Sequence, residues 1–274
     1  MEWLEWLTTP LGFGFMQRGM IAAIATGVVC AILSCFLVLK GWSLMGDAIS
    51  HAVLPGMVVA LIAGAPIVLG AFGSGLFCAL SIGYLNDRCR VKEDTLMGIV
   101  FSGMFALGLV LFSRIDTDQH LTHILFGNML GITPAELWQM LTIAAVVSPI
   151  VLLKRRDLLL YCFDPTQATA LGLSVKRLHY GLLCLLALTI VAALQAVGVI
   201  LAIAMLIAPG ATAFLLCRRF DHMLLVATLV SVFSCIAGTL ISFYLDGATG
   251  PCIVLTQALV FLLAQIRRLA GRLG

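Results

Sequence analysis

Seven long runs without a single Asp, Glu, Lys or Arg constrain the fold of this 274-residue chain more than any other feature. A helix that crosses the hydrocarbon core of a bilayer needs about 17–25 predominantly apolar residues. Five of the runs have the length of one crossing, and two of about 40 residues have room for two. The runs are residues 19–39, 48–86, 95–113, 137–153, 178–217, 222–245 and 247–266. They predict an all-α, polytopic membrane protein.

The composition agrees with this prediction. Hydrophobic residues make up 62% of the chain and charged residues 11%, less than half of the roughly 25% typical of soluble domains. This deficit excludes an ordinary soluble enzyme. The formal net charge of +3 reflects basic loops between crossings, so it does not indicate binding to nucleic acid.

The runs predict eight to nine transmembrane helices. Nine follow if the Gly and Pro residues at 63–66 and 196–198 turn the chain within the two longest runs; eight follow if one early segment enters the membrane without spanning it. Lys and Arg stay on the cytoplasmic side, and the best orientation places 14 of the 16 basic residues there. The N-terminus is then external and the C-terminus cytoplasmic. Because the connections are short, residues 1–274 are predicted to form one transmembrane domain.

Asp47 and His51, in the stretch GDAISHAVLPG at 46–56, are the strongest candidates for chemistry. Residues four positions apart share one face of a helix, so the carboxylate and the imidazole would point the same way. Ionisable groups within a membrane are costly and mark ion or substrate paths by default. A carboxylate with an imidazole also suits a first-row divalent metal. The alternative is structural, with Asp47 simply orienting the His51 ring through a hydrogen bond.

A second polar cluster lies in RIDTDQHLTHILFGN, on the predicted external side. It contains His120 and His123 together with two aspartates. These groups have the chemistry to collect cations at the mouth of a pathway. The alternative is an ordinary polar loop.

One loop on the predicted cytoplasmic side, at about 154–177, contains a well-delimited short helix. In FDPTQATALGLSVKR, Asp164 is placed to cap the N-terminus, Pro165 to occupy the first helical position and Gly172 to end the helix. Two turns are too short to be stable alone in water. The helix either presents itself to a partner or simply connects two crossings.

Several motifs are absent from the sequence. There is no G-x-x-x-x-G-K-[ST] motif, so the chain is not expected to bind ATP through a P-loop. His51 is not followed by the pattern of a metalloprotease helix. The nine cysteines are dispersed without a C-x-x-C pair and are interpreted as small apolar residues. We therefore expect no enzymatic activity and no resident cofactor.

Four stretches of the sequence resemble a known family: GWSLMGDAISHAVLPG at 41–56 and VGVILAIAMLIAPGATA at 197–213 are the most specific, and FDPTQATALGL at 163–173 and TGPCIVL at 249–255 support them. They resemble the membrane subunit of the bacterial zinc, manganese and iron importers of the ATP-binding-cassette (ABC) type. The resemblance covers residues 15–266. The wording HLTHILFGNMLG at 120–131 is closer to the manganese and chelated-iron branch than to the zinc branch.

The resemblance implies a multi-pass permease of the bacterial inner membrane that imports a divalent transition metal as a transient substrate. This metal is expected to be Mn(II) or Fe(II), with Zn(II) as the alternative. It implies a second permease subunit, a cytoplasmic ATPase and an external or periplasmic metal-binding protein as partners. Asp47 and His51 match the family positions that bind the metal in transit. The capped helix matches the loop that engages the ATPase, through Asp164, Pro165, Thr166, Gln167, Ala168, Leu171 and Gly172.

Two other classes of function use similar residues. A secondary transporter driven by an ion gradient would also place Asp and His within the membrane, but it would work without an ATPase. An intramembrane metalloenzyme would need a nucleophile or a third strong ligand within the crossings, which the sequence does not provide.

Overall fold

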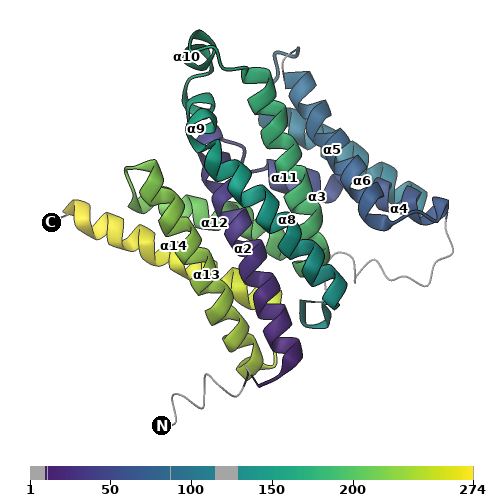
Figure 1. Cartoon of the computed structure of the whole chain (residues 1–274), viewed down its shortest axis with the longest axis vertical. Helices are drawn as coiled ribbons and strands as arrows, with labels where there is room; N and C mark the ends of the chain where they lie inside the picture. The colour runs from purple at the N-terminus through teal and green to yellow at the C-terminus, as the bar shows by residue number, and fades with distance from the viewer. Residues whose placement is uncertain (1–9, 11, 87, 115–128, 274) are drawn as a thin grey trace. The chain divides into compact units, whose positions relative to one another are not determined.

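The computed structural model describes residues 10, 12–86, 88–114 and 129–273. Within these residues the regular structure is entirely helical (Figure 1). The elements are α2 (Gly14–Lys40), α3 (Met45–Ala52), α4 (Leu54–Ala63), α5 (Ile67–Asn86), α6 (Glu93–Phe112), the 3-10 turn η1 (Met129–Gly131), α8 (Pro134–Leu153), α9 (Arg155–Phe163), α10 (Pro165–Ala170), α11 (Val175–Val197), α12 (Val199–Leu216), α13 (Phe220–Leu245) and α14 (Thr249–Leu273). The all-α prediction is confirmed.

Nine segments of the described residues are long and apolar enough to cross a membrane. Eight are single helices, and the remaining one, Met45–Ala63, is made of α3 and α4 together. Both turns predicted within the long runs are present. Gly64, with φ of +64°, ends α4, and Gly198, with φ of +81°, separates α11 from α12. Glycine adopts such angles without the steric cost of a Cβ atom.

The chain divides into two compact units. The first comprises Met1–Val38, Leu121–Pro149 and Ala193–Gly274. In this unit α12, α13 and α14 pack against one another, side by side in Figure 1. The Ser34 hydroxyl of α2 accepts a hydrogen bond from the Gly210 N–H at 3.0 Å and donates one to the Ile207 carbonyl at 3.2 Å. Ser34 thus supports α12 at the point where Pro209 interrupts its backbone hydrogen bonds.

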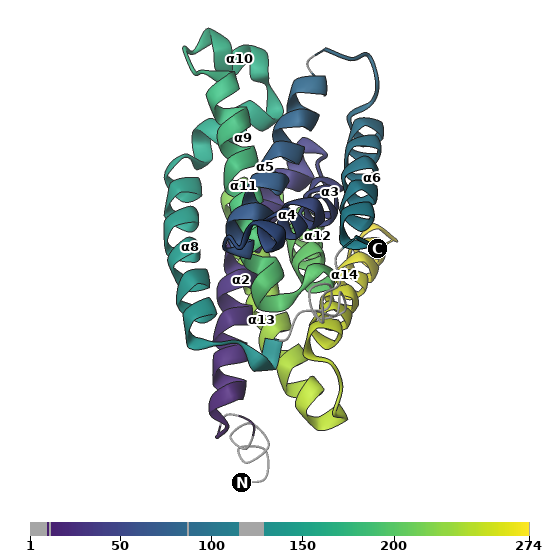
Figure 2. The same ribbon diagram turned by 90° about the vertical axis from the view of Figure 1, so that its right-hand side faces the viewer.

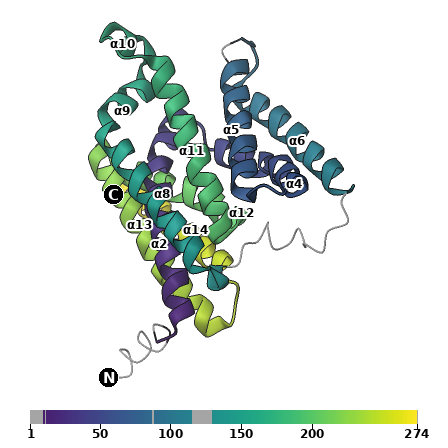
Figure 3. The same ribbon diagram turned by 45° about the vertical axis from the view of Figure 1, so that its right-hand side comes forward.

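The second unit comprises Leu39–His120 and Ile150–Ala192. Its centre is formed by α3, α4, α5 and α6, which contact one another; α4, α5 and α6 lie side by side in Figure 3. Gly56 of α4 and Gly70 of α5 face each other so closely that a Cβ atom on either would overlap the carbonyl oxygen of the other. Small residues at such crossings let two membrane helices approach at backbone distance. In the same unit α9 leads directly into α10 (Figure 2).

Candidate functional site

Asp47 and His51 lie on α3, one helical turn apart. The His51 Nε2 and Asp47 Oδ1 atoms are 3.3 Å apart, and their side chains are 29% and 33% exposed. The prediction that the two groups share one face is confirmed. Because neither side chain is fully buried, the pair remains accessible to a ligand.

The local sequence explains why this helix is short. Gly41, with φ of +78°, turns the chain after α2, and the Met45 N–H then donates to the Trp42 carbonyl at 3.0 Å to start α3. Pro55 cannot donate a backbone hydrogen bond to the carbonyl four residues earlier, which is that of His51. The helix therefore breaks between Ala52 and Leu54, and His51 lies in the last turn before the break.

Two phenylalanines of α6 flank the imidazole. The ring centroid of Phe101 is 6.0 Å from that of His51 in a stacked arrangement, and that of Phe105 is 5.2 Å away, edge-on. These contacts fix the plane of the ring while Nε2 faces the carboxylate. Sequence reasoning missed both phenylalanines. Their spacing of four residues on one helix indicates a shared face, but the spacing does not identify His51 as the residue that this face contacts.

The pair offers one imidazole nitrogen and one carboxylate to a metal. Among the described residues there is no group of three or more His, Cys, Asp or Glu side chains placed to hold a metal ion. Further donors would therefore have to be water, backbone or amide oxygens, or groups of another chain. The predicted second cluster, with His120 and His123, lies outside the described residues.

The capped helix of the 154–177 loop is present as predicted. One carboxylate oxygen of Asp164 accepts hydrogen bonds from the Thr166 and Gln167 N–H groups, both at 3.0 Å, and from the Thr166 hydroxyl. Pro165 occupies the first position of α10. At the other end Gly172 has φ of +80°, and the N–H groups of Gly172 and Leu173 donate back into the helix. This is the Schellman arrangement of helix ends.

The loop presents an exposed surface with an apolar edge. Phe163 and Leu171 are 68% and 67% exposed, whereas Ala168 is fully buried and fixes the inner face of α10. Polar groups lie between them, since Thr166 and Gln167 are also exposed. Large exposed apolar residues rimmed by polar ones are typical of a protein contact surface.

Removal of the Asp164 carboxylate should loosen α10. The hydrogen bond from the Thr166 hydroxyl, and then the one from the Gln167 N–H, hold the pKa of this carboxyl below its usual value. The capping contribution is therefore present at neutral pH and is lost as the pH falls through the lowered pKa of the folded state. In Asp164→Ala we expect faster hydrogen exchange at the amides of Thr166 and Gln167, whereas Asp164→Ser, which can still cap, should retain protection. Equal exchange in the wild type and Asp164→Ala would contradict this role.

A family model agrees with these features. The model described as the ABC 3 transport family matches residues 12–268. The chain is a member of the ABC 3 transport family. With nine apolar segments among its described residues, this member of the family is a multi-pass permease of the inner membrane.

Relatives of this ABC 3 family member are similar over nearly its whole length. The chelated iron transport system membrane protein YfeD of Yersinia pestis is 71% identical over 260 residues, 95% of this chain and 88% of the relative. The manganese transport system membrane protein MntB of Synechocystis is 49% identical over 96% of this chain and 86% of the relative. The solved structure of PsaBC from Streptococcus pneumoniae in complex with Fab contains a chain with a TM-score of 0.84 and 37% identity, covering 95% of this chain and 94% of that one.

Proposed function

We propose that this permease imports a divalent transition metal, Mn(II) or Fe(II), and that Asp47 and His51 bind the ion in transit. The observation that carries the proposal is the 3.3 Å pair of carboxylate and imidazole within an otherwise apolar membrane segment. The names of the relatives support the choice of metal, since they refer to manganese and to chelated iron. The metal is the transported substrate, and no resident cofactor is proposed.

The two side chains have separate tasks at this site. The Asp47 carboxylate supplies negative charge, which lowers the cost of bringing a dication into an apolar environment. The His51 imidazole adds a nitrogen ligand that favours transition metals over Mg²⁺ and Ca²⁺. Two protein ligands bind an ion weakly. Weak binding is required at a transport site, because the ion must also be released.

The chain is proposed to be the transport subunit, with ATP hydrolysis on a separate cytoplasmic ATPase. Its docking surface would be the capped loop, and the supporting observations are the exposed apolar edge at Phe163 and Leu171 and the defined ends of α10. The proposed docking residues are Asp164, Pro165, Thr166, Gln167, Ala168, Leu171 and Gly172, of which Ala168 contributes from the buried side. An external or periplasmic metal-binding protein and a second permease subunit complete the proposed assembly.

Reconstitution in proteoliposomes tests the proposal. The chain would be incorporated with its second permease subunit and its ATPase, with ATP enclosed on the cytoplasmic side and loaded binding protein outside. Uptake of radiolabelled Mn, Fe and Zn would then be compared. We expect uptake of manganese and iron that requires ATP, and weaker uptake of zinc. Uptake by the chain alone under an imposed ion gradient would instead support a secondary transporter. Preferential uptake of zinc would overturn the choice of metal.

A further inference from the structure

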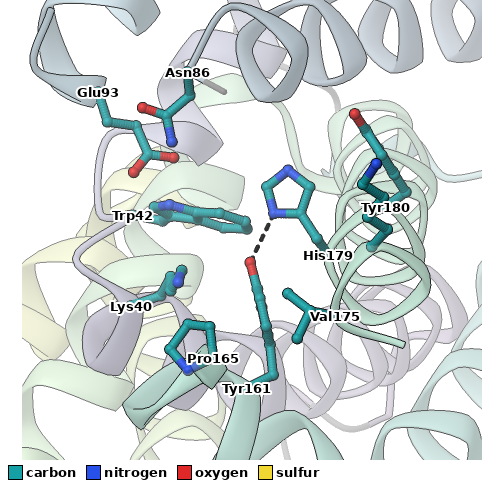
Figure 4. Close-up of a pocket in the computed structure, with 10 residues that line it drawn as sticks. Lys40, Trp42, Asn86, Glu93, Tyr161, Pro165, Val175, His179 and Tyr180 are labelled. Atoms are coloured by element: carbon teal, nitrogen blue, oxygen red, sulfur yellow. Dashed lines mark hydrogen bonds between the residues drawn. The ribbon is translucent and has the colours of Figure 1, made fainter. Parts of the chain in front are cut away.

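A cavity of about 230 Å³ lies in the second unit, on the side predicted to face the cytoplasm. Its lining brings together residues from four separate stretches of the chain (Figure 4). They are Lys40, Trp42, Asn86, Glu93, Tyr161, Pro165, Val175, Lys176, His179 and Tyr180. Pro165, the first residue of α10, is thus in the wall of the same cavity as the residue from which α6 starts, Glu93.

Three aromatic side chains connect the two sides of this cavity. The Tyr161 hydroxyl and the His179 Nδ1 atom are hydrogen-bonded at 2.7 Å, the dashed line in Figure 4. The His179 ring in turn contacts the Trp42 ring edge-on, with a centroid distance of 5.3 Å. Trp42 is 1% exposed and Tyr161 is 2% exposed. These contacts therefore connect Tyr161 of α9, the helix directly before α10, through His179 to Trp42 in the segment between α2 and α3.

Two charged residues, Lys40 and Glu93, lie beside these aromatic side chains. The Lys40 Nζ atom lies over the Tyr161 ring, 4.5 Å from its centroid, and 5.9 Å from that of Trp42. The Glu93 carboxylate points toward the nitrogen side of the Trp42 indole in Figure 4, and its Oε1 atom is buried. The Lys40 contacts tie Tyr161 and Trp42 to their surroundings through electrostatics as well as packing.

Helix α3, which carries His51, and helix α6, whose phenylalanines contact the His51 ring, both begin beside residues that line this cavity. Helix α3, which carries Asp47 and His51, starts when the Met45 N–H donates to the Trp42 carbonyl. Helix α6, which carries the two phenylalanines beside His51, starts at Glu93. A displacement of Trp42 and Glu93 would therefore shift both the metal-binding pair and the rings that hold it.

The cavity gives the partly buried His179 ring room to change its arrangement between Tyr161 and Trp42. Close-packed interiors resist small displacements, whereas a cavity beside a hydrogen-bonded aromatic chain permits a second packing. Coupling between distant sites is carried by elements that have two discrete arrangements.

We propose that Tyr161, His179 and Trp42 are positioning residues that transmit movement of α10 to the Asp47–His51 pair. This inference rests on the proposed function, because it takes α10 as the docking site of the ATPase and the pair as the metal site. Neither Tyr161 nor His179 would touch the metal. Their effect would be to make the state of the pair depend on the state of the ATPase.

Tyr161→Phe tests the inference, because it removes only the hydroxyl that bonds to His179. Tyr180→Phe is the matched control: Tyr180 follows His179 on the same helix and lines the same cavity. The permease would be assembled with its ATPase, and hydrogen exchange of the 45–52 segment would be measured with and without ATP. We expect an ATP-dependent change in exchange in the wild type and in Tyr180→Phe, reduced about fivefold in Tyr161→Phe, the factor that corresponds to one hydrogen bond. His179→Gln can still bond to Tyr161 but lacks the ring that contacts Trp42, so it should retain only part of the change.

Transport provides the second readout. In Tyr161→Phe the amount of metal moved per ATP hydrolysed should fall about fivefold, with ATPase activity retained. An unchanged exchange response of 45–52 in Tyr161→Phe, or a loss in Tyr180→Phe of the same size, would overturn the inference. Because the exchange measurement needs no metal, it is independent of the proposed substrate. Failure of the substrate assignment would appear instead as absent uptake in a wild type whose 45–52 segment responds to ATP.

Discussion

Uptake of manganese and iron should fall by more than about tenfold when His51 is replaced by alanine, since even residues behind the ligands change metal affinity by 10- to 100-fold. The variant removes one of the two donors that the described residues bring together. Asp47→Asn should have a similar effect while keeping the shape of the side chain, because it removes the negative charge that compensates the dication. Uptake per assembled complex, at matched amounts in the membrane, is the quantity to measure.

Two variants serve as controls for this experiment. His222→Ala removes an exposed histidine at the start of α13, and Asp157→Asn removes a carboxylate whose nearest ion-pair partner is Lys154, at 3.4 Å. Neither group belongs to the proposed metal site, so both variants should transport at wild-type rates. If His51→Ala transports as well as His222→Ala, the pair is structural and only orients α3 against α6.

Gly70→Val should prevent the second unit from folding normally. A Cβ atom at Gly70 would overlap the backbone carbonyl of Gly56 and lie 2.6 Å from the Ala60 Cβ. Because the obstacle is backbone rather than the end of a flexible side chain, α4 and α5 would have to separate. Overpacking in a well-packed interior costs about 1–3 kcal/mol even where the neighbours are side chains, and here we expect more. The thermal unfolding temperature of the purified permease in detergent and its yield are the measurements.

Gly73→Val is the matched comparison for this prediction. Gly73 lies on the same helix, one turn further along, and a Cβ atom there would have no neighbour within 4 Å. We expect this variant to purify and unfold like the wild type. Equal behaviour of the two variants would show that the Gly56–Gly70 crossing does not determine the packing of α4 on α5.

Much of the fold follows from local patterns. The apolar runs predicted the membrane segments because each segment needs only its own composition to enter a bilayer. The ends of α10 were predictable for the same reason: Asp164, Pro165 and Gly172 act within their own turn. The shared face of Asp47 and His51 is likewise a property of a single helix.

The remaining features depend on contacts between segments far apart in sequence. The approach of Gly56 to Gly70 requires two helices to meet at one point, and many glycines in the chain make no such contact. The Tyr161–His179–Trp42 contacts join α9, α11 and the segment between α2 and α3. Nothing in the sequence around any one of these residues identifies the other two as its neighbours. The division of Met45–Ala63 into two helices was also missed, although Pro55 marks the place.

Pulsed electron paramagnetic resonance of Mn(II) bound to the assembled complex shows directly whether His51 is a ligand of the ion. Coupling of the manganese electron spin to nitrogen reports imidazole ligands. We predict a histidine coupling in the wild type and in His222→Ala that is absent in His51→Ala. Bound manganese that keeps its histidine coupling in His51→Ala would show that the ion is held elsewhere and would contradict the assignment of His51 as a ligand.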